Sequence, residues 1–162
     1  MNPAKTITLA LLLLLASGCA KNVGSTFDPL AIFPAQATWN WDPAEIIIPS
    51  DERLVSLNIN GIVRESIVQG FAEHGYTEAP VGSKAPYLLS YEIGIGRTIT
   101  STRATAIGTL SVSLVEADSN RRVWIGFIRV NVDTSRTEAE RRNLLRREVR
   151  NMLRDFPPSQ RS

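Results

Sequence analysis

The chain has 162 residues, of which 18 are lysine or arginine and 16 are aspartate or glutamate, with one histidine and one cysteine. Its formal net charge of +2 is much smaller than the dense basic charge typical of nucleic-acid-binding domains, so the composition argues against a nucleic-acid partner. Because a single cysteine cannot form a disulfide within the chain, the fold must be stabilised by its hydrophobic core alone.

The N-terminal segment has the three parts of a secretory signal, and its cysteine makes it similar to a bacterial lipoprotein signal. Lys5 supplies the positive charge, an apolar run follows, and the small residues Ser17 and Gly18 stand directly before Cys19. The apolar run is too short for a transmembrane helix, which needs roughly 20 apolar residues. We therefore predict that residues 1–18 are a signal peptide and that Cys19 is the lipidation site.

The predicted lipidation determines where we expect the protein to work. In such a lipoprotein the thiol carries a diacylglycerol and the new amino group carries a further acyl chain, so two or more acyl tails are buried in the bilayer. Burial stabilises the anchor by about 0.8 kcal/mol per methylene, which is enough to hold a protein at a membrane without a membrane span. The next residue is Ala20, not the aspartate that typically signals inner-membrane retention in enteric bacteria. We expect the protein at the periplasmic face of the outer membrane, and inner-membrane retention is the alternative.

The composition after Cys19 divides the mature chain into three parts. Residues 19–36 are polar, contain proline and lack a hydrophobic period, which predicts a lipidated N-terminus and tether. Residues 37–158 are long enough for one domain, and residues 159–162 are a polar tail. The exported part is therefore expected to be a single domain on a short tether.

The first half of this domain is predicted to contain one strand and one helix. Residues 37–41 alternate aromatic and polar side chains, which places Trp39 and Trp41 on one face of a strand. Ser50 is a suitable N-cap and Gly75 supplies a left-handed stop, so a helix is predicted between them. Its apolar residues recur at spacings of three and four, and they are Val55, Ile59, Ile62, Val63, Ile67 and Phe71.

The second half is predicted to contain three strands and a helix. Alternating side chains in residues 87–95, 107–116 and 122–132 predict the strands, with a hairpin turn at residues 118–120. A helix is predicted to start near Thr137, which has a glutamate three residues later, as in a capping box. Its apolar stripe comprises Leu145, Val149, Met152, Leu153 and Phe156.

The order of the predicted elements is β-α-β-β-β-α. Each apolar stripe must be buried against another element, and a sheet with helices on one face is the usual solution for this order. The sequence therefore predicts an α+β fold in which an antiparallel sheet of four or more strands carries two helices packed on one face.

Five short segments stand out by their order and spacing. They are Thr38-Trp39-Asn40-Trp41, His74-Gly75-Tyr76, residues 87–91, Val123-Trp124-Ile125-Gly126 and Phe156-Pro157. Together they resemble a family of bacterial envelope lipoproteins, domain of unknown function 4136. Two positions depart from the family pattern, because Pro86 stands where members often have an aspartate and Ile125 where they often have a basic residue. The resemblance implies an α+β envelope lipoprotein and brings no known catalytic residues.

The residue types that carry hydrolysis or metal binding are sparse. His74 is the only histidine, and its place before the predicted helix stop explains it as a capping or surface residue. The obvious carboxylate pairs, Asp51 with Glu52 and Glu138 with Glu140, stand in predicted first helical turns, where acids stabilise the helix dipole. We therefore expect no catalytic residues, no bound metal and no cofactor.

Arginines recur every four residues along the last predicted helix, at Arg142, Arg146, Arg150 and Arg154. This spacing places guanidinium groups on neighbouring turns of one helix face. A solvated face is the simpler interpretation, and contact with anionic lipid headgroups or an acidic partner, at about 1 kcal/mol per arginine, is the alternative. The alternative predicts binding that weakens as the salt concentration rises.

These features together predict a non-enzymatic, lipid-anchored envelope protein that acts as a binding or accessory module. Tethering to a membrane raises the local concentration of such a domain near an envelope protein or glycan partner. The alternative is a cell-wall (peptidoglycan) hydrolase or an activator of one, and an assay of peptidoglycan turnover would distinguish the two classes.

Overall fold

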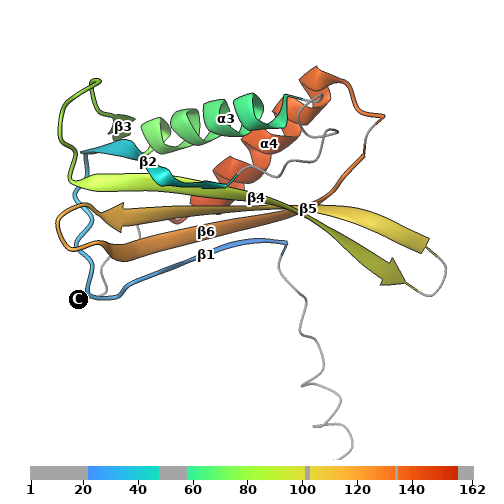
Figure 1. Cartoon of the computed structure of the whole chain (residues 1–162), viewed down its shortest axis with the longest axis horizontal. Coiled ribbons are helices and arrows are strands. Elements are labelled where there is room, and N and C mark those ends of the chain that lie inside the picture. The colour runs from blue at the N-terminus through green and yellow to red at the C-terminus, as the bar shows by residue number, and fades with distance from the viewer. Residues whose placement is uncertain (1–21, 48–57, 101–102, 134, 157–162) are drawn as a thin grey trace, which may run out of the picture.

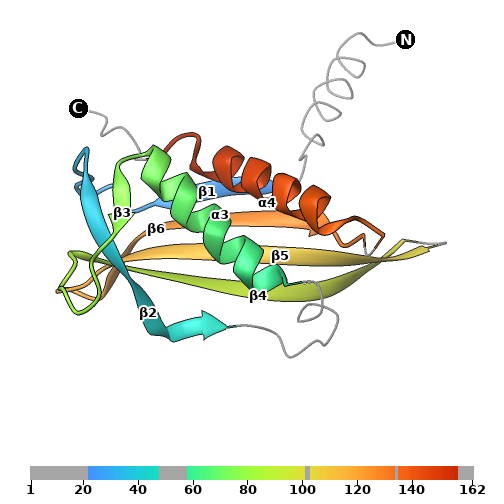
Figure 2. The same cartoon turned by 90° about the horizontal axis from the view of Figure 1, so that it is seen from above.

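The fold is one six-stranded sheet with two helices on one face (Figure 1 and Figure 2). The computed structural model describes residues 22–47, 58–100, 103–133 and 135–156. The helices are α3 (Ile59–Glu73) and α4 (Glu138–Leu153), and neither is long and apolar enough to cross a membrane. The strands are β1 (Val23–Phe27), β2 (Ala37–Ile47), β3 (Tyr76–Glu78), β4 (Tyr87–Thr100), β5 (Arg103–Glu116) and β6 (Arg121–Asn131).

The predicted α+β fold is confirmed, but the prediction of an antiparallel sheet is wrong because the sheet is mixed. Its strand order is β1-β6-β5-β4-β2-β3. The strands β1, β6, β5 and β4 pair antiparallel, whereas β2 pairs in parallel with both β3 and β4. The helix α3 connects β2 to β3 and returns the chain to the same end of the sheet, as helical crossovers between parallel strands do.

The sequence pattern predicts neither β1 nor β3, so the predicted element order is incomplete. β1 lies within residues 19–36, where we expected only a tether, and it pairs with β6 from Val23 opposite Ile128 to Phe27 opposite Trp124. β3 has three residues, too few to show an alternating pattern, and it pairs with β2. Both are edge strands that depend on a neighbouring strand rather than on their own sequence.

The two helices differ in how they begin. α3 starts after Asn58, which has a φ of 49° and makes no side-chain cap, while the predicted cap Ser50 and the predicted stripe residue Val55 lie outside the described residues. It is followed by Gly75 with a φ of 81°, which confirms the predicted left-handed stop. The Thr137 side chain caps α4 as predicted.

The cap of α4 is a complete capping box. The Glu140 amide donates to Thr137 Oγ1 at 3.3 Å, and the Thr137 amide donates to Glu140 Oε2 at 2.7 Å. The amide and the hydroxyl of Thr137 both donate hydrogen bonds to the Glu140 carboxylate and lower its pKa, so this carboxylate is ionised at neutral pH beside the positive end of the helix dipole. The start of α4 is therefore determined locally, by residues that are close in sequence.

Aromatic rings fill the centre of the core between the sheet and the helices. The Phe156 ring centroid lies 4.9 Å from that of Tyr76, 5.2 Å from Phe71 and 5.4 Å from Trp124. Both predicted helical stripes face the core where the structure describes them, and all of these residues are buried except Ile59, which is partly buried and packs against the core. The buried stripe residues are Ile62, Val63, Ile67, Phe71, Leu145, Val149, Met152, Leu153 and Phe156.

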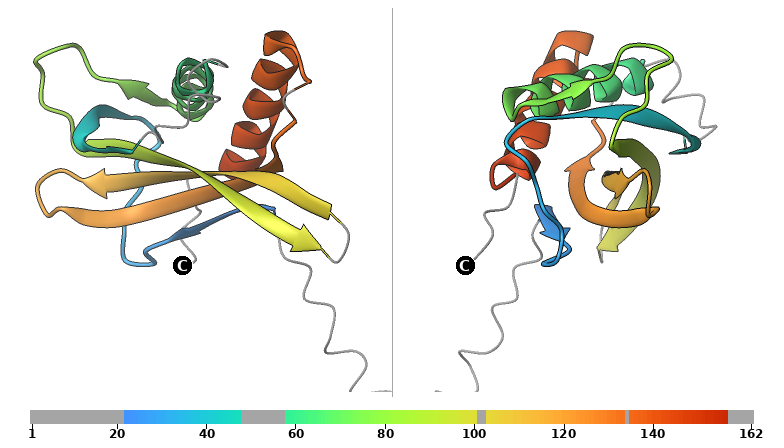
Figure 3. Two further views of the ribbon diagram at one scale, coloured as in Figure 1. Left: turned by 45° about the vertical axis from the view of Figure 1, so that its right-hand side comes forward. Right: turned by 90° about the vertical axis from the view of Figure 1, so that its left-hand side faces the viewer.

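The opposite face of the sheet is not covered by either helix (Figure 3). The strand register places three tryptophans on the helix-facing side of the sheet, together with Tyr87. They are Trp39 and Trp41 of β2 and Trp124 of β6. Trp39 and Trp124 are fully buried there and Trp41 packs against the core. The tryptophans therefore serve the core and do not form an aromatic docking surface on the uncovered face.

Two buried tyrosines fasten the connection between β1 and β2 to the sheet. Tyr76 Oη donates to the Pro34 carbonyl at 2.7 Å, and Tyr87 Oη donates to the Ile32 carbonyl at 3.1 Å. Burial is the main cause that raises the pKa of both phenols. The neighbouring Tyr87 raises the pKa of Tyr76 further, and the charge of Glu116 raises the pKa of Tyr87 further. Both side chains are therefore neutral donors in the folded protein.

The protein is expected to lose stability as the pH rises above about 10. The pKa of Tyr76 and of Tyr87 is raised in the folded state, so their contribution is complete below the unfolded pKa of about 10 and is lost as the pH rises through the folded values. Urea unfolding at pH 8, 9, 10 and 11 would measure this. Tyr76→Phe should make the decline shallower, and an equally steep decline in that variant would contradict the assignment to Tyr76.

Candidate functional site

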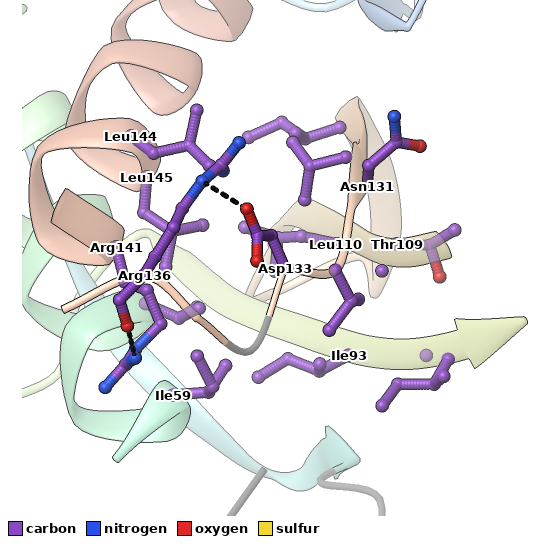
Figure 4. Close-up of a pocket in the computed structure, with 17 residues that line it drawn as sticks. Ile59, Ile93, Thr109, Leu110, Asn131, Asp133, Arg136, Arg141, Leu144 and Leu145 are labelled. Atoms are coloured by element: carbon purple, nitrogen blue, oxygen red, sulfur yellow. Dashed lines mark hydrogen bonds and ion pairs between the residues drawn. The ribbon is translucent and has the colours of Figure 1, made fainter. Parts of the chain in front are cut away.

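An apolar pocket lies between the helices and the sheet, at the end of the sheet where β6 leads into the connection to α4 (Figure 4). Its empty volume is about 700 Å³ when the open mouth is included. Branched aliphatic side chains from both helices and three strands line it, including Ile59, Val63, Ile93, Leu110, Val130 and Leu145.

The pocket exists partly because the helices separate at one end. Near their C-terminal ends they are in close contact, since a Cβ on Gly70 of α3 would lie 2.8 Å from side-chain atoms of both Val149 and Leu153 of α4. Toward their N-terminal ends the two helices diverge, as the view from above shows (Figure 2). The pocket occupies the space that this divergence leaves over the sheet.

A glycine in the sheet contributes the rest of the space. Gly108 of β5 pairs with Ile95 of β4 and with Val130 of β6, and it therefore occupies a helix-facing position with no side chain. A Cβ built there would lie 3.3 Å from a side-chain carbon of Val132 and 3.6 Å from one of Val130, which both line the pocket, so a larger side chain at this position would crowd the floor of the pocket. The missing side chain was the one sequence signal for the pocket, because Gly108 is in phase with the apolar residues Leu110, Val112 and Leu114.

Charged groups stand at the mouth of the pocket. Arg136 Nε lies 3.7 Å from Asp133 Oδ2. Hydrogen bonds from Ser135 to the carboxylate, with the nearby arginine, lower the pKa of Asp133, so this side chain is ionised at neutral pH. The ion pair leaves Arg136 and Asp133 with no net charge between them.

A second arginine at the mouth has a different environment. Arg141 Nη1 donates to the Arg136 carbonyl oxygen (Figure 4). Arg141 Nε is buried and has no hydrogen-bond partner among the described residues, and no carboxylate within that part of the chain forms an ion pair with this guanidinium. The mouth therefore carries one guanidinium with unused hydrogen-bonding capacity.

The N-terminal end of β1 lies beside the strand that lines this pocket. The Asn22 carbonyl accepts a hydrogen bond from the Arg129 amide at 2.7 Å, and Val23 pairs with Ile128, which lines the pocket. The predicted lipidation site Cys19 lies outside the described residues, three residues before Asn22, which is at most about 10 Å of extended chain. The path from the predicted lipid to the pocket is therefore short.

The predicted arginine series faces α3. Arg142 forms ion pairs with Glu65 of α3 and, at 2.9 Å, with Glu138, and Arg146 also pairs with Glu65. Arg150 Nε lies 3.3 Å from Oε2 of a second glutamate of α3, Glu73. The fourth member, Arg154, lies 3.4 Å from Asp155. Contact with an anionic surface stays a prediction for these four residues, and such a surface would have to compete with their present carboxylate partners.

The candidate catalytic residues are not brought together. His74 lies at the end of α3, with its ring centroid 6.1 Å from that of Phe156. Glu138 is paired with Arg142 and Glu140 belongs to the capping box, while Asp51 and Glu52 lie outside the described residues. Within the part of the chain that the structure describes, no three histidine, cysteine, aspartate or glutamate side chains gather in a way that could hold a metal ion.

Comparison with known proteins gives one family match and several similar folds. Residues 23–158 match a domain of unknown function, DUF4136, and none of the curated proteins matches the chain. The PelC dodecamer from Paraburkholderia phytofirmans is 12% identical, with a TM-score of 0.50, over 82% of this chain and 96% of that one. A PDZ domain protein from Parabacteroides distasonis is 11% identical, with a TM-score of 0.55, over 86% of this chain and 36% of that one. Lipoprotein GNA1162 from Neisseria meningitidis is 11% identical, with a TM-score of 0.47, over 74% and 99%.

Proposed function

The chain belongs to the DUF4136 family, and we propose that it is a lipid-anchored envelope protein that works as a non-enzymatic binding module. The observation that carries the proposal is the place of the apolar pocket. It opens between α3, α4 and the sheet, beside the end of β1 that leads back to Cys19. An anchor at Cys19 would hold this pocket close to the membrane surface.

The chemistry of the pocket favours binding over catalysis. Most of its lining is aliphatic, and aliphatic side chains can neither transfer protons nor attack a substrate. The charged groups at its mouth are arginines and one aspartate, and Asp133 is already occupied by Ser135 and Arg136. These residues are suited to hold a ligand and to orient its polar end.

Replacing the lipidation site is the direct test of anchoring. In cells fed a labelled fatty acid, the wild-type chain should take up label and sediment with membranes, and Cys19→Ser should lose both properties. As a matched control, Ser119→Cys in the Cys19→Ser background places a thiol in the exposed β5–β6 turn and should not restore labelling. Unchanged labelling of the Cys19→Ser chain would overturn the proposal.

We further propose that the anchor holds the domain at the outer membrane, facing the periplasm. The support is Ala20 in the position that carries aspartate in inner-membrane lipoproteins of enteric bacteria. In an enteric host, density-gradient fractionation should place the wild-type protein with outer membranes, and Ala20→Asp should move it to the inner-membrane fractions. Equal distribution of the two proteins would contradict the outer-membrane assignment.

The non-enzymatic role is tested against peptidoglycan hydrolysis. The mature chain with Cys19→Ser should release no soluble fragments from purified peptidoglycan. Release that disappears on substitution of one carboxylate, for example Glu138→Gln, would replace the binding module with a hydrolase. Arg147→Gln is a suitable control, because it changes another exposed side chain of the same helix without removing a carboxylate.

A further inference from the structure

We propose that the pocket between α3, α4 and the sheet binds one unbranched acyl chain that ends in a single anionic group. This inference names the ligand class of the binding site and therefore rests on the proposed function. Three features of the pocket support it, which are the apolar interior, the arginine with an unsatisfied nitrogen at the mouth and the place of the mouth relative to the anchor.

The interior selects for an apolar chain. Ile59, Val63, Ile93, Leu110 and Leu145 present only hydrocarbon to the space between them. A polar group placed among them would lose its hydrogen bonds to water without replacement, which is unfavourable. Each buried methylene instead contributes about 0.8 kcal/mol, or roughly fourfold in affinity.

The mouth selects for an anionic end. Among the residues that the structure describes, the buried Nε of Arg141 has no acceptor, and leaving a buried donor unsatisfied is costly. A carboxylate or phosphate oxygen would supply the acceptor and balance the charge of this guanidinium. Arg136 offers less to a ligand because Asp133 already neutralises it. Arg141, which forms no ion pair within the described part of the chain, fits one anionic group at the mouth.

The position of the pocket fits a lipid supply. Asn22 is bonded to Arg129 on β6, and Cys19 is three residues earlier. An acyl anchor at Cys19 would therefore keep Asn22, which lies beside the pocket-lining strand β6, within about 10 Å of chain from the bilayer surface. Amphiphiles with one acyl chain and an anionic end partition into that surface, so the ligand would reach the pocket from a high local concentration.

Binding of laurate, compared with the uncharged dodecanol, tests the inference directly. The protein is the mature chain, residues 19–162, with Cys19→Ser, which contains every strand, helix and core residue that the structure describes. Titration calorimetry below the micellar concentration should give saturable binding of one laurate. Decanoate, with two fewer methylenes, should bind about tenfold more weakly, and dodecanol should bind at least about tenfold more weakly than laurate.

Two variants separate the contributions of the pocket and of the mouth. Gly108→Leu places a side chain in the floor and should weaken laurate binding at least about tenfold, whereas Val81→Leu, on a fully exposed loop, should leave it unchanged. Arg141→Gln should remove the preference for laurate over dodecanol, whereas Arg147→Gln, on the outer side of the same helix, should preserve it. If Gly108→Leu does not fold, the comparison of Arg141→Gln with Arg147→Gln still tests the inference.

Several results would overturn the inference. They are absence of saturable laurate binding, equal affinity of the Gly108→Leu and wild-type chains when both are folded, and a laurate preference that Arg141→Gln leaves intact. Mass spectrometry of protein repurified after incubation with laurate or with vesicles that contain lysophosphatidylglycerol, which has one acyl chain and one phosphate, distinguishes a fatty acid from a membrane phospholipid as the source. Retention of either lipid supports the inference and identifies its source, and retention of neither overturns it.

Failure of this inference can be told apart from failure of the proposed function. The binding assay uses a chain without its lipid anchor, so it does not depend on the processing of Cys19. If the protein is labelled normally in cells but the purified chain does not bind laurate, the ligand class is rejected and the proposed lipid anchor is retained. If the purified chain binds laurate but the protein is not labelled in cells, the lipid anchor is rejected and the proposed ligand of the pocket is retained.

Discussion

Phe156→Ala is expected to lower the free energy of unfolding by about 3–5 kcal/mol, a large part of the stability of a domain of this size. The ring is 3% exposed and contacts Tyr76, Phe71, Trp124 and Phe33 with centroid distances between 4.9 and 5.8 Å. These neighbours belong to a strand, a helix, a second strand and a loop, which cannot all move to fill the space. Urea unfolding of the mature chain, followed by tryptophan fluorescence, would measure the loss.

The matched control for this prediction is Phe27→Ala. Phe27 is 47% exposed and contacts Phe33 at a centroid distance of 6.5 Å, so the same change in side chain removes much less buried area. We expect its cost to be about 1 kcal/mol. Equal losses for the two variants would show that Phe156 does not hold the elements of the core together.

Gly75→Ala is expected to destabilise the protein by about 2–4 kcal/mol, for two separate reasons. The φ of 81° at Gly75 is unfavourable for any residue with a Cβ, at about 1–2 kcal/mol. A Cβ on Gly75 would also lie 2.6 Å from the backbone oxygen of Ala35, and the clash would displace the start of β2, because the Ala37 amide donates to the Gly75 carbonyl at 3.2 Å.

Gly82→Ala separates these two reasons. Gly82 has a φ of 82°, almost the same as that of Gly75, but nothing lies within 4 Å of a Cβ built there. Its replacement should therefore cost only the backbone term of about 1–2 kcal/mol. The difference between the two variants measures the clash with Ala35. A Gly75→Ala loss no greater than that of Gly82→Ala would contradict the predicted clash.

The parts of the fold that the sequence predicted correctly are those that depend on neighbours in the chain. The capping box of Thr137 and Glu140 and the stop at Gly75 are decided within a few residues, and the structure confirms both. The buried stripes of α3 and α4 follow from helical periodicity, which is also local. The hairpin turn before β6 is confirmed as well, with Asn120 at a φ of 52°.

The missed parts depend on contacts between distant residues. β1 becomes a strand because its backbone pairs with β6, about a hundred residues later, and its sequence VGSTF shows little of the alternation that marks a strand. The parallel pairing of β2 depends on the path of α3 across the sheet. A local pattern carries no information on which strand becomes the neighbour, or in which direction it runs.

The features of the candidate site also fall into those that the sequence alone determines and those that depend on contacts between distant residues. The sequence by itself determined the predicted lipoprotein signal at Cys19, the absence of an internal disulfide and the arginine spacing on α4, because each is a property of residue types and their order. Only the tertiary structure decided that arginines of this series form ion pairs with Glu65 and Glu73 of α3. It also decided that Gly108 lies under the pocket between the two diverging helices, and that Arg141 has an unsatisfied nitrogen at the mouth of this pocket. The physical reason is that ion pairs and pockets form between side chains that folding brings together from distant positions, and the free energy of such contacts depends on their geometry in three dimensions.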